Sequence, residues 1–123
     1  MKILTKDLEG DALDWAVAKV WEPGGDEVRW LESRKAGLTP FFSRDWRFGG
    51  PLLEHCVSRG LLTEGLDQKY TGPRTTVKVT MTRWSTFNCG DTLLVAVCRC
   101  YIAFMLGDVV DVPQEVLDLA PVA

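Results

Sequence analysis

The residues that most often carry out catalysis are few and scattered in this sequence. His55 is the single histidine of the chain and stands beside Glu54 in a predicted helix. A hydrolase would pair this histidine with a serine or cysteine nucleophile and an acid. No Gly-x-Ser-x-Gly motif is present, and no nucleophile stands near His55 in the sequence. We therefore expect His55 to lie on a helix surface or to be partly buried, and we expect no enzymatic activity.

The four cysteines do not form a metal-binding pattern. Cys56, Cys89, Cys98 and Cys100 contain no Cys-x-x-Cys spacing. Cys98 and Cys100 stand two apart in a predicted helix, so their side chains diverge by about 200° and cannot grip one zinc ion together. The first residues become polar too soon for a secretory signal. The sequence therefore predicts free thiols in a cytoplasmic protein, with no metal, no disulfide and no cofactor.

Two segments have the composition of a ligand-binding site. Residues 43–51 and 84–92 combine aromatic rings with glycines, and each leads into a predicted helix. A helix N-terminus presents N–H groups that can hold an anion, an aromatic ring can stack on a nucleobase, and arginine pairs with phosphate. The alternative is ordinary helix capping, with rings that fill the end of the core. The predicted ligand-binding residues are Trp46, Arg47, Phe48, Gly49, Gly50, Trp84, Asn88, Thr92 and Arg99.

Arg99 is included because it is the lone charge in the apolar segment 93–106. A buried guanidinium needs an anionic partner. That partner is either an internal carboxylate, which is the more ordinary case, or a ligand phosphate.

The elements that must position these residues follow from periodicity and capping signals. We expect Asp11 to cap the first helix, Pro51 to stand in the first turn of the second, and Gly107 to end the third. The predicted helices are residues 11–20, 51–60 and 93–106, with a short turn of helix at 112–117, and the predicted extended segments are 27–32, 38–43 and 75–84. Residues 43–51, 65–74 and 85–91 are predicted loops or turns. This order predicts an α/β (α+β) fold, a small β-sheet layered with about three helices.

Size and charge narrow the function classes. The 123 residues, 46% of them hydrophobic, suit a single domain, residues 1–123. A net charge of −3 without basic runs argues against a nucleic-acid polymer as partner. The apolar segment 93–106 is too short to span a membrane. Because this segment is apolar almost all round, we expect a central helix or one that packs against a second subunit, and hence a homo-oligomer.

Three blocks of the sequence resemble the NinX-like family of phage proteins. The blocks are Ala12-Leu13-Asp14-Trp15-Ala16-Val17-Ala18, then Asp45-Trp46 with Gly49-Gly50-Pro51-Leu52-Leu53-Glu54, then residues 93–101 followed by Gly107-Asp108 and Val112-Pro113. The family comprises small phage accessory proteins without an established activity. It is similar to phage domains described as αβα sandwiches, which implies an αβα-sandwich-like fold here. The segment 61–82 matches the family poorly.

The resemblance and the aromatic segments together give a functional expectation. We expect a non-catalytic phage protein in the host bacterial cytoplasm that counters host defence by sequestering a small nucleotide-derived signalling molecule. The alternative is an accessory protein that inhibits or adapts a host or phage protein, with exposed tryptophan and phenylalanine as interface anchors.

Overall fold

The chain is a mixed α+β protein. A computed structural model describes residues 1–21, 25–38, 40–58, 67–71, 74–81, 86–90 and 92–119, and it describes the backbone alone for strand residues 67–89. Trp84, predicted as a ligand-binding residue, and the last two residues of the predicted helix 51–60 lie outside the described residues. The elements are β1 (Lys2–Leu4), η1 (Thr5–Asp7), α1 (Gly10–Val20), α2 (Glu27–Lys35), α3 (Trp46–Ser58), β2 (Asp67–Thr71), β3 (Arg74–Met81), β4 (Thr86–Gly90), α4 (Leu93–Leu106), β5 (Val109–Asp111) and α5 (Gln114–Leu117).

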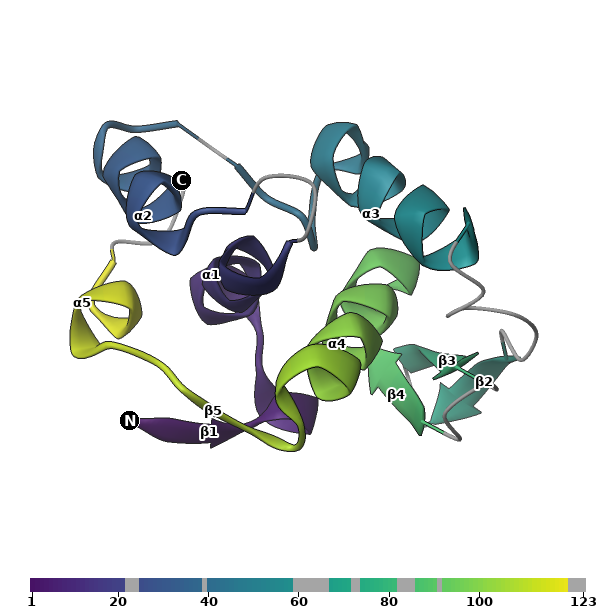
Figure 1. Cartoon of the computed structure of the whole chain (residues 1–123). Helices are drawn as coiled ribbons and strands as arrows, with labels where there is room; N and C mark the ends of the chain where they lie inside the picture. Colours follow the sequence, from purple (N-terminus) through teal and green to yellow (C-terminus); the bar gives the residue numbers. More distant parts are fainter. Residues whose placement is uncertain are drawn as a thin grey trace.

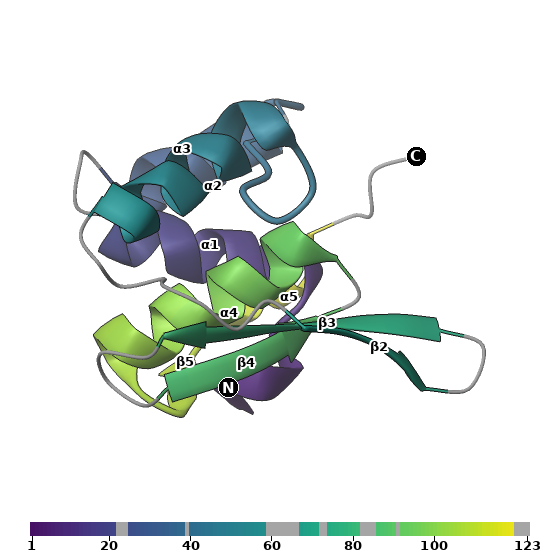
Figure 2. The ribbon, with the colours of Figure 1, turned by 90° about the vertical axis from the view of Figure 1, so that its right-hand side faces the viewer.

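Helix α4 is central to the packing. It contacts α1 and α3, and it also contacts β3 and β4. Figure 2 shows α1, α2 and α3 on one side of α4 and the three-stranded sheet on the other. The predicted helix 93–106 and its stop at Gly107, which has φ 88°, are confirmed. Because α4 is covered by the chain's own elements, its apolar surface does not require a second subunit.

Two antiparallel sheets complete the fold. In the smaller one, β1 at the N-terminus pairs with β5, the strand that follows α4 (Figure 1). Ile3 lies opposite Val110, and the Val110 side chain is buried. The larger sheet has the order β2-β3-β4. The sequence predicted one of these strands, β3, whereas residues 67–71 and 86–90 were expected as turn and loop and are strands instead.

The segment 27–32 was predicted as a strand, and this prediction is wrong. Asp26 caps helix α2, accepting hydrogen bonds from the N–H groups of Val28 at 3.0 Å and Arg29 at 3.1 Å. The buried residues Trp30, Leu31 and Arg34 follow helical spacing. The strand was predicted because apolar and charged residues partly alternate over this segment. Val28, however, is 62% exposed, so the apolar residues of the segment do not share one buried face.

Helix α3 begins at Trp46, so the predicted loop 43–51 is only partly a loop. The Asp45 carboxylate accepts the N–H of Arg47 at 2.9 Å and thereby caps the helix. Pro51 lies inside α3 instead of in its first turn. Gly49 and Gly50 are helical residues, and residues 42–44, expected to be extended in part, form a turn.

The two adjacent glycines of α3 have different surroundings, which gives a stability prediction. A Cβ on Gly49 would overlap the backbone oxygen of Phe42 and approach Leu94 Cδ2 to 2.7 Å. Apart from its neighbours in the chain, a Cβ on Gly50 would have Trp46 Cε3 as its nearest contact among the described residues, at 3.8 Å. We expect Gly49→Ala to lower the free energy of unfolding by about 1–3 kcal/mol. The control Gly50→Ala should change it by less than about 1 kcal/mol, because the better helix propensity of alanine is opposed by the restriction that Pro51 places on the residue before it.

Urea denaturation of both variants tests this prediction. Equal effects of the two substitutions would contradict the close approach of α3 to Phe42 and α4.

Candidate functional site

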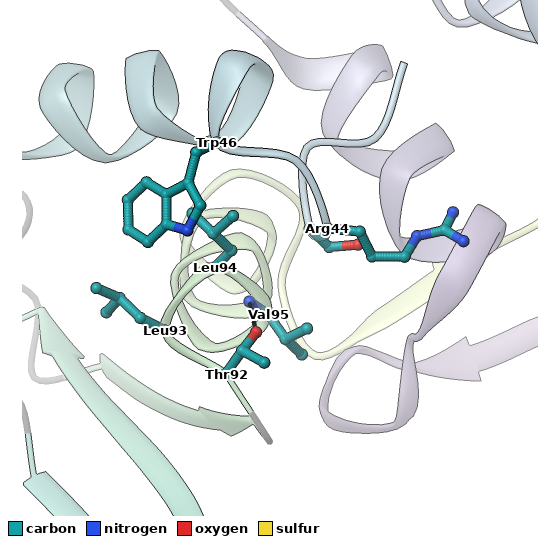
Figure 3. Close-up of a pocket in the computed structure, with 7 residues that line it drawn as sticks. Arg44, Trp46, Thr92, Leu93, Leu94 and Val95 are labelled. Atoms are coloured by element: carbon teal, nitrogen blue, oxygen red, sulfur yellow. Dashed lines mark hydrogen bonds between the residues drawn. The ribbon is translucent and has the colours of Figure 1, made fainter. Parts of the chain in front are cut away.

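A pocket of about 410 Å³ lies where the first turns of α3 and α4 approach each other. Figure 3 shows its labelled side chains coming from these two helices and from the turn before α3. The lining residues are Ser43, Arg44, Trp46, Thr92, Leu93, Leu94 and Val95. The volume is within the range typical of small-molecule sites. Of the residues predicted from the sequence, the pocket brings together Trp46 and Thr92.

Trp46 provides the aromatic surface of the pocket. It is the first residue of α3 and is 57% exposed, although it is a large apolar side chain. In Figure 3 its indole extends from α3 toward Leu93 and Leu94 at the start of α4. The ring also lies over the next turn of its own helix, beside Gly50. A flat ring held in this way offers a face to a second flat group.

The N-terminus of α4 provides polar groups on the opposite wall. The hydroxyl oxygen of Thr92 accepts the N–H of Val95 at 3.2 Å and caps the helix. The N–H groups of Leu93 and Leu94 belong to the first turn, where a helix supplies no acceptor. The first turn of α4 contains no acidic residue, so its positive dipole end is not neutralised by a carboxylate of that turn.

The two arginines near the pocket are both ion-paired. The Arg44 side chain runs away from the pocket toward α1 (Figure 3). One of its Nη atoms lies 3.0 Å from Asp14 Oδ2 and 3.2 Å from Asp11 Oδ1, and its guanidinium stacks on Phe41 at 3.6 Å. Arg47 pairs with Asp45 at 2.8 Å at the surface, where it lowers the pKa of Asp45 and has its own pKa raised.

Asp14 of α1 is a fully buried carboxyl group directly behind the pocket wall. Its Oδ1 accepts the N–H of Ser43 at 2.7 Å and its Oδ2 accepts from Arg44. Burial raises its pKa from 3.8 to about 6, although the hydrogen bonds from Arg44 and Ser43 act in the opposite direction. Asp14 thus ties two pocket-lining residues to the core.

The other predicted site residues have structural contacts. Phe48 packs edge-on against Phe42, with ring centres 6.2 Å apart. Arg99 donates from Nε to the Leu8 carbonyl at 2.8 Å, so it joins α4 to the chain before α1. Asn88 belongs to β4, opposite Val79 of β3. The Gly49 N–H donates to the Asp45 carbonyl at 2.8 Å and is part of the helix.

His55 and the described cysteines, for which the sequence predicted neither catalysis nor metal binding, are part of the packing. The His55 ring lies edge-on to Trp21, with ring centres 5.0 Å apart, and it also contacts Tyr101. Cys56, Cys98 and Cys100 are buried free thiols, and burial raises the pKa of Cys98 well above its usual value. Within the described part of the chain, no group of three or more histidine, cysteine or acidic side chains could hold a metal ion.

Sequence reasoning missed several residues that form or support the pocket. They are Ser43, Arg44, Leu93, Leu94 and Val95 of the lining, and Asp14 behind it. A signal for Asp14 was present, because it is the lone charge among residues 12–18, all of which are buried. The same reasoning was applied to Arg99 but not to Asp14.

Among the helices of the described residues, none has the length and apolar character needed to cross a membrane.

Comparisons with known proteins add no family assignment. No protein-family model matches the chain, and no curated protein matches it.

Proposed function

We propose that this chain is a non-catalytic binding protein that sequesters a small nucleotide-derived ligand in the pocket between α3 and α4. The observation that carries the proposal is the half-exposed indole of Trp46, which faces the N-terminus of α4 across a space of about 410 Å³. A nucleotide needs a ring for its base and N–H donors for its phosphate. Trp46 and the first turn of α4 supply these two kinds of group.

Charge in the pocket is consistent with a ligand of low net charge. Arg44 is held by Asp11 and Asp14, so the helix end is the main positive element of the lining. Arg47 follows Trp46, is 76% exposed and pairs with Asp45. Water screens an exposed pair of this kind, so a phosphate can replace the Asp45 carboxylate. Cyclic dinucleotides and cyclic ADP-ribose carry few negative charges for each aromatic base, which suits one indole ring, one helix N-terminus and one exposed arginine.

The biological setting of the proposal rests on the resemblance to NinX-like phage proteins. A phage protein that sequesters a nucleotide signal would counter a host defence that depends on the signal, and it would act in the bacterial cytoplasm. The αβα-sandwich-like arrangement implied by the resemblance is part of the same proposal. It is supported by the position of α4 between helices and the β2-β3-β4 sheet. The homo-oligomer expected from the sequence remains a prediction that light scattering can test.

Binding should depend on the indole of Trp46. We expect Trp46→Ala to weaken the affinity for cyclic di-AMP about ten- to hundredfold, because stacking contributes about 1–3 kcal/mol per base. Trp46→Phe should retain most of the affinity. Calorimetry against a panel of cyclic dinucleotides and cyclic ADP-ribose measures both effects.

Val57→Ala is a matched control for this experiment. Val57 lies in the same helix and is 55% exposed, but it does not line the pocket. Its replacement should leave the affinity unchanged. If the folded wild-type protein binds no member of the panel, the proposal is wrong.

A protein partner is the second candidate, and a specific observation favours it. The pocket lining is largely apolar, and both nearby arginines are already paired with carboxylates. An exposed tryptophan beside leucine and valine side chains is typical of an interface anchor. In that case a host or phage protein would co-purify in stoichiometric amounts with the wild type and not with Trp46→Ala.

A further inference from the structure

The turn that precedes α3 is held in place by a buried ionic cluster. We name it the Asp14 cluster, consisting of Asp11 and Asp14 of α1, Arg34 of α2 and Arg44 of the turn. Arg34 binds Asp11 through two hydrogen bonds, of 2.9 Å and 3.2 Å. Arg44 bridges Asp11 and Asp14. The cluster therefore fastens the turn to α1, and it joins α1 in turn to α2.

The cluster acts directly on the pocket through the backbone. Asp14 binds the Ser43 N–H at 2.7 Å and the Arg44 side chain at 3.0 Å, and both residues line the pocket. Asp45 and Trp46 follow immediately in the chain. The position of the turn therefore determines where α3 begins and where the Trp46 side chain leaves the backbone. The Asp14 side chain is 0% exposed and cannot exchange these partners for water while the turn stays in place.

We propose that Asp14 is a positioning residue for the pocket, and that protonation of its carboxyl group frees Arg44 from Asp14, loosens the Ser43–Arg44 wall and lowers the affinity for ligand. This inference rests on the proposed function for its affinity part, while its conformational part is independent of any ligand. A neutral carboxyl group can still accept the Ser43 N–H, but it loses the charge that attracts Arg44. The wall then keeps the Ser43 hydrogen bond to Asp14 and the Arg44 pair with Asp11, but it loses the attraction between Arg44 and Asp14.

The surroundings of Asp14 favour a proton transfer in an accessible range of pH. Burial disfavours its charged form and raises its pKa to about 6. The charged groups that face it are Arg44 from the turn and Asp11 from its own helix, with Arg34 beyond Asp11. From α4 it faces the Cys98 thiol, whose raised pKa keeps it neutral in this range, with Cys56 of α3 beside that thiol. From α5, Glu115 pairs with Lys35 at the surface.

Nuclear magnetic resonance of the ligand-free protein tests the conformational part. Between about pH 4 and about pH 8, the carboxyl carbon of Asp14, the Ser43 amide and the Trp46 indole N–H should titrate with one midpoint, near pH 6. In Asp14→Asn the amide and indole signals should stay constant over this range. The control Asp118→Asn, which changes an exposed carboxylate in the last turn of the described chain, should titrate as the wild type does. An indole signal that does not follow Asp14 would overturn the inference, and this holds even if Asp14→Asn does not fold, because the wild type alone gives the answer.

The affinity part is measured with cyclic di-AMP as the probe. Wild-type affinity should fall about five- to tenfold from about pH 7 to about pH 5, whereas Asp14→Asn should show no such fall. By linkage, the probe should lower the titration midpoint of Asp14. A pH-independent wild-type affinity would contradict the coupling. If the probe does not bind at all, the proposed function fails for this ligand, and the ligand-free titration alone decides the role of Asp14.

Discussion

We expect Arg44→Met to lower the free energy of unfolding at neutral pH by about 3 kcal/mol, the lower end of the range for breaking a buried pair. Arg44 is the charged partner of Asp14, whose side chain is 0% exposed, and it also contacts Asp11 and the Phe41 ring. Methionine keeps much of the apolar length of the side chain but leaves Asp14 without its cation. We expect a cost at the lower end of the range for buried pairs because the Arg44 side chain is itself 38% exposed.

Arg47→Met is the matched control for this substitution. Arg47 also pairs with an aspartate, Asp45, but the Arg47 side chain is 76% exposed. Its loss should cost much less than the loss of Arg44, because water screens a pair this exposed. Urea denaturation at about pH 7 and about pH 5 measures both variants. At the lower pH the cost of Arg44→Met should shrink, because Asp14 is then largely protonated. Equal costs of the two variants, or a cost of Arg44→Met that does not depend on pH, would contradict this account of the Asp14 cluster.

The sequence predicted those elements whose signals are local. Helix α4 has its cap at Thr92, a long apolar run and a glycine stop at Gly107, and each signal lies within the element itself. Strand β3 has a run of β-branched residues. By contrast, β1 and β5 are three residues each and exist only because Lys2 to Leu4 pair with Val109 to Asp111, a contact that no local pattern encodes.

The same distinction separates the predicted and missed parts of the site. Trp46 and Thr92 were predicted because an aromatic ring and a cap at a helix start are local features. Asp14 was missed because its partners, Ser43 and Arg44, stand about thirty positions later in the chain. The glycines of α3 were expected to bind phosphate, but Gly49 is required by close packing against Phe42 and Leu94. A glycine pair gives the same sequence signal in either role.

The pH dependence of stability gives the second large effect. The pKa of Asp14 rises from 3.8 to about 6 on folding, because burial outweighs its hydrogen bonds. The folded state therefore binds this proton more tightly than the unfolded state does. The resulting stabilisation is complete below about pH 4 and is lost as the pH rises through about 6, and its full size is about 3 kcal/mol. This is the reverse of the usual behaviour of an ion-paired aspartate, whose pKa is lowered.

The difference between the wild type and Asp14→Asn isolates this contribution, because the other titrating groups are shared by both proteins. We expect the free energy of unfolding of the wild type, relative to that of the variant, to fall by about 3 kcal/mol between about pH 4 and about pH 7. Urea denaturation at closely spaced pH values measures the difference. A difference that rises with pH would mean that Arg44 and Ser43 stabilise the carboxylate more than burial destabilises it. Asp14 would then stay ionised throughout this range and could not release the turn before α3.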